Sequence, residues 1–317
     1  MNVLRLLSAC ALLALPAWLG AGEPAPDPAP ASDPLRGIKS ETLTYRVLAW
    51  KGARVLSMNL GKVTFTLSRD DDHVERQLVL RAEAKGGMTA YPYDAAMTAR
   101  LRDSDYLEHD ADSIRTRPGY KTRKLAFTSQ GADYLKHKHC AVPTLCHNPA
   151  HFSRADDESE VHCDGCDDPK HYVWHMASRV RCGGRIYDML AAMYVGRALP
   201  VQVDGAPQTI RIVSADELWD IEASAEKEET ITVAAGRFDC LKVLLKTLPA
   251  NDTAKRHVNE FQGPFGLHDS VGIYVDKATR QLVLVRGTAD VGTSFQVEVA
   301  LTERKVEYFD GAGPAKP

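Results

Sequence analysis

Apolar and polar side chains alternate with a period of two residues along most of this 317-residue sequence. Leu43, Tyr45 and Val47 alternate with polar neighbours, and residues 62–67 repeat the pattern. Successive side chains of a β-strand point to opposite faces, so this period indicates strands with one buried face. Further candidate strands, separated by glycine and proline turns, cover residues 77–84, 96–102, 121–129, 210–214, 229–233, 240–247, 271–275, 281–286 and 294–302. We therefore predict a mainly β fold, an antiparallel curled sheet or barrel-like β domain with one short helix.

The short helix is predicted at residues 187–199, the one stretch with helical spacing of its apolar residues. Met189, Met193 and their neighbours form a single apolar stripe, and Pro200 ends it. Sheet strands are expected before and after this segment.

The N-terminus has the three parts of a secretory signal peptide: Arg5, an apolar core from Leu6 to Leu19, and small residues at its end. We predict a signal peptide at residues 1–21, with cleavage after Ala21 or Gly22, and a periplasmic or secreted mature protein. The alternative is a lipoprotein anchored at Cys10, which ends a lipobox-like sequence but has almost no apolar core before it. A proline-rich linker is predicted at residues 22–38 and a disordered tail at 307–317.

The β domain is predicted at residues 39–306, interrupted by an irregular insertion at 136–182. The formal net charge is -3, with acids and bases interspersed, so neither a nucleic acid nor an anionic membrane surface is expected as a partner. No segment after the leader is long and apolar enough for a transmembrane helix.

The predicted insertion contains five of the seven cysteines. Cys140, Cys146, Cys163 and Cys166 have the two-pair layout of a tetrahedral zinc site, and one structural zinc is a candidate cofactor. The alternative is disulfides among the same cysteines, which an oxidising compartment favours. Cys182 and Cys240 are candidates for a separate disulfide.

The sequence contains no catalytic motif that we can identify, so no catalytic residue is assigned. The Cys163–Cys166 pair is spaced like a redox dithiol, but Asp164, Asp167 and Asp168 surround it with negative charge, which raises a thiol pKa. A thiol-redox enzyme is therefore the less favoured reading.

Three stretches resemble the bacterial domain of unknown function 3108 family. They are residues 40–47 (SETLTYRV), residues 188–197 (DMLAAMYVGR), and the pair 235–243 (AGRFDCLKV) and 272–276 (GIYVD). The resemblance implies an exported, mainly β protein with no established activity. It also implies structural roles for Asp188 as a helix N-cap, Tyr194 as a core residue and Arg197 as a surface or paired residue. The sequence departs from the family at Ala191, where serine is usual, and in its Cys/His-rich insertion.

These observations favour an exported, envelope-associated, non-enzymatic protein that binds an apolar or lipid-like ligand, or another envelope protein, on a curved sheet. The alternative is a zinc-stabilised interaction module centred on residues 140–182.

Overall fold

The computed structural model describes residues 33–52, 57–70, 76–88, 91–117, 121–139, 152–154, 161–163, 172–256, 268–290 and 294–309. Strands dominate: β1 (Ile38–Trp50), β2 (Met58–Asp70), β3 (Gln77–Met88), β4 (Tyr91–Arg102), β5 (Glu108–Arg117), β6 (Lys121–Thr128), β7 (Gly131–His139), β8 (Phe152–Arg154), β9 (Val161–Cys163), β10 (Tyr172–Arg181), β11 (Gln208–Ser214), β12 (Glu217–Val233), β13 (Gly236–Pro249), β14 (His268–Asp276), β15 (Leu282–Asp290) and β16 (Ser294–Tyr308). The described helices are α1 (Met189–Val195), the 3-10 turn η4 (Gly196–Ala198) and α2 (Asp252–Arg256).

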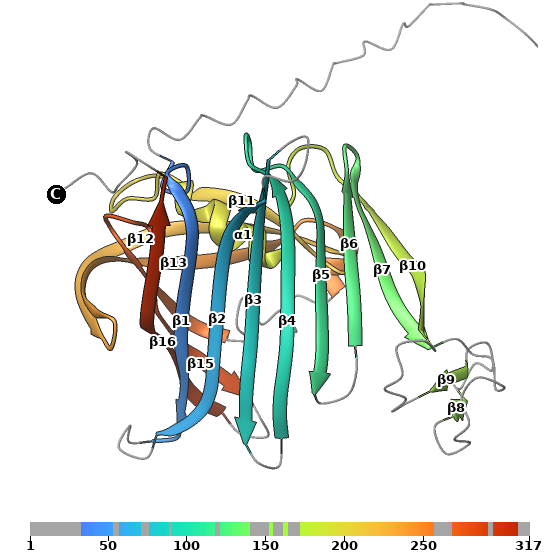
Figure 1. Ribbon diagram of the computed structural model, residues 1–317, viewed down its shortest axis with the longest axis horizontal. Helices are drawn as coiled ribbons and strands as arrows, with labels where there is room; N and C mark the ends of the chain where they lie inside the picture. The colour runs from blue at the N-terminus through green and yellow to red at the C-terminus, as the bar shows by residue number, and fades with distance from the viewer. Residues whose placement is uncertain are drawn as a thin grey trace, which may run out of the picture.

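Fourteen of these strands form one antiparallel sheet in the order β10-β7-β6-β5-β4-β3-β2-β1-β16-β15-β14-β13-β12-β11. The sheet curls into a nearly closed barrel, and β8 and β9 form a small separate pair (Figure 1). The predicted mainly β, barrel-like fold is confirmed. Because β1 pairs with β16, the two ends of the described chain meet in the middle of the sheet.

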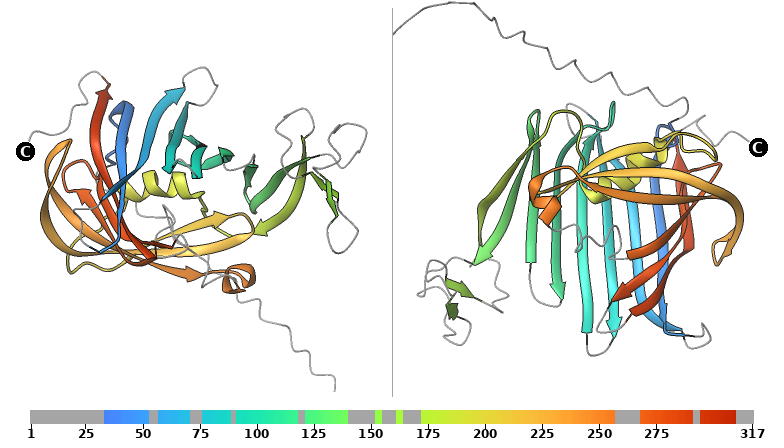
Figure 2. Two further views of the ribbon diagram at one scale, coloured as in Figure 1. Left: turned by 90° about the horizontal axis from the view of Figure 1, so that it is seen from below. Right: turned by 180° about the vertical axis from the view of Figure 1, so that it is seen from behind.

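The segment that connects the two edge strands, β10 and β11, carries α1 and η4. In the view from below, α1 lies between the wall formed by the first strands and the wall formed by β11–β13 (Figure 2). The first wall supplies core residues such as Leu43, Tyr45 and Phe65, and the Tyr45 and Phe65 rings meet edge to face at 5.5 Å. The helix therefore separates two apolar inner surfaces that would otherwise face each other.

Strands β5, β7 and β10 were not predicted, because their sequences lack clear alternation. β5 is rich in charged residues, but the carboxylates of Asp110 and Asp112 pair with Arg100 of β4 at 2.6 and 3.2 Å. Cross-strand pairs of this kind stabilise a sheet without an apolar pattern. Pairing with neighbouring strands, and not the local sequence pattern, therefore determines that these segments form strands.

The folded body is larger than the sequence indicated. β7 extends to His139 and β10 begins at Tyr172, so the main sheet includes both ends of the predicted insertion. Leu35, placed in the predicted linker, is fully buried, and Arg69 donates a hydrogen bond to its carbonyl oxygen at 2.8 Å. At the other end, Phe309 donates its N–H to the Gly37 carbonyl, where a disordered tail had been expected. Residues 1–32 and 310–317 lie outside the described residues.

A pair of glycines allows the backbones of β2 and β3 to approach closely. Gly61 and Gly86 are opposite each other, with φ angles of +130° and +154°. A Cβ atom added at Gly86 would lie 2.1 Å from the Leu60 carbonyl oxygen and 2.5 Å from the Gly61 Cα. Backbone atoms cannot move aside as a flexible side chain can, so only glycine fits here.

We therefore expect Gly86→Ala to lower the free energy of unfolding by about 3 kcal/mol, from backbone clash and strain at positive φ. Gly183→Ala is the matched control, because a Cβ at Gly183 meets no atom within 4 Å. Urea unfolding followed by circular dichroism measures both variants. Equal midpoints for the two would contradict this account of the glycine pair.

Candidate functional site

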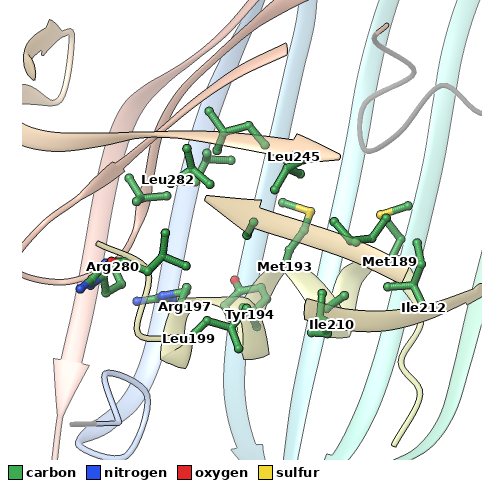
Figure 3. A pocket seen from close by; sticks show the side chains of 18 of the residues that line it. Met189, Met193, Tyr194, Arg197, Leu199, Ile210, Ile212, Leu245, Arg280 and Leu282 are labelled. Atoms are coloured by element: carbon green, nitrogen blue, oxygen red, sulfur yellow. The ribbon is translucent and has the colours of Figure 1, made fainter. Parts of the chain in front are cut away.

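A cavity of about 170 Å³, partly open to solvent, lies between α1 and the inner faces of β11–β15 (Figure 3). Its wall is almost entirely aliphatic and aromatic, and is formed by Leu43, Tyr45, Phe65, Met189, Ala192, Met193, Tyr194, Gly196, Arg197, Leu199, Val201, Ile210, Ile212, Ile221, Ala223, Val243, Leu245, Ile273, Val275, Arg280 and Leu282. Several of these apolar side chains, including Met189, Leu245 and Ile273, are only half-buried despite their interior position. The cavity is therefore a space with an apolar wall that the protein's own side chains do not fill.

The helix α1 is positioned by its two faces. Leu190 and Ala191 are buried in the main core, and α1 contacts β3 and β4, while Met189, Ala192 and Met193 line the cavity. The predicted helical stripe is confirmed, although the helix is shorter than residues 187–199 and ends in the 3-10 turn η4 before Pro200.

Asp188 is the N-cap of α1, and its Oδ1 accepts a hydrogen bond from the Ala191 N–H at 2.6 Å. This is the role that the family resemblance implied for Asp188. A side-chain acceptor at this position satisfies a backbone donor that has no partner within the helix. Because α1 is only seven residues long, such end contacts matter more than its intrinsic helix propensity.

Arg197, at the other end of this segment, forms a buried bidentate ion pair with Glu41 of β1. The Nη1–Oε1 and Nη2–Oε2 distances are 2.7 and 3.2 Å, and the two side chains are 7% and 0% exposed. Gln281 donates a hydrogen bond to the same carboxylate, and Arg304 donates to Gln281 at 3.0 Å. Of the two predicted roles for Arg197, paired and surface, the structure shows the paired one. Burial makes the pair costly to break from one side.

Two tyrosines complete this end of the cavity. The Tyr45 hydroxyl donates to the Leu282 carbonyl oxygen at 2.7 Å. Tyr194 is 4% exposed, in agreement with its predicted core position, but its buried hydroxyl has no hydrogen-bond partner among the described residues. Burial raises the pKa of both hydroxyls, so both stay protonated and can donate. The Arg197 Nε is likewise buried without a partner among the described residues.

Arg280 also lines the cavity, from the turn between β14 and β15. Its Nη1 donates to the Val201 carbonyl oxygen at 2.9 Å. The turn is fixed by Asp276, whose carboxylate accepts hydrogen bonds from the N–H and hydroxyl of Thr279 at 2.9 and 2.6 Å. Sequence reasoning missed Arg280 and Glu41, because an isolated charged residue in a strand or turn carries no local sign that it faces inward.

Two buried acidic residues, Glu108 of β5 and Asp188, are in contact next to the N-terminus of α1. The Glu108 Oε2 accepts the Asp188 backbone N–H at 2.7 Å, and the two residues are each 3% exposed. Burial, with the nearby Asp188 carboxylate, raises the pKa of Glu108 well above its usual range. Burial raises the pKa of Asp188 to about 6, although the hydrogen bond from Ala191 partly offsets it. The pair therefore retains a proton at pH values where surface carboxyls have lost theirs.

The predicted Cys182–Cys240 disulfide is corrected by the structure, in which both thiols are free. The two residues belong to different core clusters. Cys182 lies 3.5 Å from the Arg211 Nη1, whereas Cys240 packs with Ile231 and Tyr274. Burial, followed by the nearby Asp276, Asp239 and Glu229 charges, raises the pKa of the Cys240 thiol to about 12, so this thiol is chemically inert near neutral pH.

The predicted zinc ligands Cys140, Cys146 and Cys166 lie outside the described residues, and for Cys163 only the backbone, in β9, is described. Zinc binding and the alternative disulfides among these cysteines stay predictions. In the described ranges, no helix has the length and apolar character needed to cross a bilayer.

No protein-family model matches the chain, and no curated protein matches it. Among solved structures, the fold is similar to a β-barrel-like protein of domain of unknown function 1849 from Brucella abortus, with a TM-score of 0.46, 7% identity, and 86% of this chain and 99% of that chain covered. It is also compared with a candidate lipoprotein from Parabacteroides distasonis, at a TM-score of 0.26 and 11% identity, over 84% of this chain and 95% of that chain. Neither comparison singles out the domain of unknown function 3108 family, so that membership stays a prediction.

From the buried contact between Glu108 and Asp188 we predict how the stability of the protein depends on pH. The unfolded chain loses its carboxyl protons near pH 4, whereas burial in the folded chain raises the pKa of Asp188 to about 6 and the pKa of Glu108 well above its usual range. The folded state therefore binds more protons across this window, and its free energy of unfolding falls as pH rises through it. Glu108→Gln keeps the hydrogen bond to the Asp188 N–H but has no proton to lose.

We expect Glu108→Gln to become more stable relative to wild type as pH rises from 5 to 8, by about 2 kcal/mol across that range. Urea midpoints at a series of pH values measure this difference. The exposed Glu303→Gln on β16 controls for the loss of one carboxylate. Parallel pH profiles for wild type and Glu108→Gln would show that Glu108 is ionised in the folded state.

Proposed function

We propose that this chain is an exported, envelope-associated, non-enzymatic protein that holds an apolar or lipid-like ligand inside its barrel. The observation that supports this best is the cavity between α1 and β11–β15, whose wall is formed mainly by aliphatic and aromatic side chains. Pockets for small apolar molecules are concave, largely preformed and lined by such residues, with a few placed polar groups.

The size of the cavity is compatible with binding. Its volume of about 170 Å³ is comparable to an apolar protein cavity of about 150 Å³ that takes up benzene. Burying each CH₂ group of a ligand contributes about 0.8 kcal/mol, so an eight-carbon chain gains about 6 kcal/mol before the cost of ordering it. The half-buried side chains of the wall would then lose their remaining contact with solvent.

The chemistry of the wall favours binding over catalysis. Among the described residues that line the cavity there is no Ser, Thr, Cys, His, Asp, Glu or Lys, and burial raises the pKa of the two lining tyrosines, which keeps them protonated. The wall therefore offers no ready nucleophile or general base. Its polar side chains are two tyrosines and two arginines, which bind and orient.

Filling the cavity should abolish ligand retention. Ala223 of β12 is 7% exposed and lines the cavity, so we expect Ala223→Phe to place a ring in the ligand's volume. The purified proteins are extracted with organic solvent, and mass spectrometry identifies what they released. We expect an apolar molecule from wild type and at least about tenfold less from Ala223→Phe, because overpacking leaves no room for it.

Thr209→Phe is the matched control, because Thr209 is exposed on β11, next to the cavity-lining Ile210. It adds the same ring outside the cavity and should release as much ligand as wild type. A ligand that stays bound to Ala223→Phe in the wild-type amount would place the binding site elsewhere. Absence of any apolar molecule from wild type, together with no uptake of added alkyl probes, would refute ligand binding.

The cysteine-rich segment supports a second, separate proposal of a structural zinc site. His139 and Tyr172 are paired at the end of the β7–β10 hairpin, so the segment between them starts and returns at one point. Within it, β8 and β9 pair Phe152 with Cys163. A closed segment of this kind can bring the two cysteine pairs to one ion.

Mass spectrometry of the exported chain tests both the zinc site and the predicted cleavage of the signal peptide. Under native conditions we expect one bound zinc per chain. The mass of the denatured, metal-free chain should show the four proposed zinc ligands as reduced thiols, together with Cys182 and Cys240, and an N-terminus just after Ala21 or Gly22. A metal-free chain whose mass is lowered by two hydrogens per disulfide would establish the disulfide alternative, and a lipidated Cys10 would establish the anchored form.

A further inference from the structure

We propose that the ligand of the cavity is an alkyl chain that ends in a carboxylate, and that Tyr194, Arg197 and Arg280 bind this head group. This inference rests on the proposed function and adds the chemical class of the ligand. Arg280 and Arg197 lie at one end of the cavity, with Tyr194 beside Arg197, whereas Met189 and Ile212 lie at the other end (Figure 3). The cavity thus has one polar end and one apolar end, as an amphipathic ligand does.

The polar end has donors that the described protein leaves unused. The hydroxyl of Tyr194 and the Nε of Arg197 are both buried without a hydrogen-bond partner among the described residues. A buried donor that lacks a partner costs free energy, and the cost is recovered when an acceptor arrives. Both residues that carry these donors line the cavity at this end.

The charge at this end favours an anion over a neutral head group. The Arg197 charge is compensated by Glu41, but the Arg280 guanidinium has no acidic partner among the described residues and makes one hydrogen bond, to the Val201 carbonyl oxygen. Of the five N–H groups of a guanidinium, that bond uses one. A guanidinium binds a carboxylate by charge-assisted hydrogen bonds, which are stronger than its hydrogen bonds to a neutral head group.

The backbone of Arg280 gives independent support. Its φ angle is +56°, in the left-handed region that glycine adopts freely and other residues adopt at a cost of about 1–2 kcal/mol. Glycine would suit this turn better, so the arginine is not required by the backbone conformation. A strained position next to a cavity is typical of residues whose side chain has a binding role.

Isothermal titration calorimetry of the full mature protein with three ligands of equal chain length tests the head group. Octanoate, 1-octanol and octylamine differ only in the terminal group. We expect octanoate to bind about tenfold more tightly than 1-octanol, as one or two charge-assisted hydrogen bonds allow, and octylamine to bind most weakly. Equal affinities for octanoate and 1-octanol would overturn the head-group inference but leave the cavity proposal standing. No binding of any of the three would overturn both.

Two variants separate a binding role from a structural one. Arg280→Gly removes the guanidinium and relaxes the left-handed backbone, so we expect about tenfold weaker octanoate binding, unchanged 1-octanol binding, and an unfolding midpoint close to that of wild type. Tyr194→Phe removes a hydroxyl without a described partner and should also weaken octanoate alone. Ala215→Gly is the matched control, because Ala215 has a φ angle of +59° in the β11–β12 turn and does not line the cavity. Wild-type octanoate affinity in both Arg280→Gly and Tyr194→Phe would overturn the assignment of these residues.

Discussion

The buried ion pair between Arg197 and Glu41 is the contact on which the interior depends. It joins residues 156 positions apart in the sequence and ties the segment that crosses the barrel to β1, in the middle of the sheet. At the other end of α1, Glu108 of β5 accepts the N–H of the helix cap. A seven-residue helix is marginal by itself, so these two buried carboxylates hold it in place. Because the helix is held at both ends, the two walls cannot close onto each other and the cavity persists.

The two ends of α1 differ in their electrostatics, so the interior has an acidic, protonated end and a positively charged end. Near Asp188, two carboxyls share a buried site and retain a proton. Near Arg197, guanidinium groups and tyrosine hydroxyls gather, with one carboxylate already bidentately bound. The aliphatic wall lies between these ends. A molecule with an anionic end and an apolar chain would therefore enter in one orientation.

Sequence reasoning predicted what depends on local pattern. The alternation at Leu43 and Tyr45 predicted β1 because one face of this strand is buried, and the spacing of Met189 and Met193 predicted the helix. It missed β5, whose charges are compensated across the strand by Arg100, and it placed Leu35 in a linker. It also missed Glu41 and Arg280, because their partners lie far away in the sequence. The predicted Cys182–Cys240 pair failed for the same reason, since the curl of the sheet places the two residues in separate clusters.

The pairing of β1 with β16 has a kinetic consequence. Ile38 is opposite Tyr308, so nearly the whole described chain must be available before the central ladder of the sheet can form. Contacts between such distant residues are slow to form, because the loop-closure entropy is lost before the pairing is gained. A growing polypeptide of this topology stays open until its last strand has been made. That delay is compatible with the proposed export, because a chain that closes its barrel late can cross a membrane before it folds.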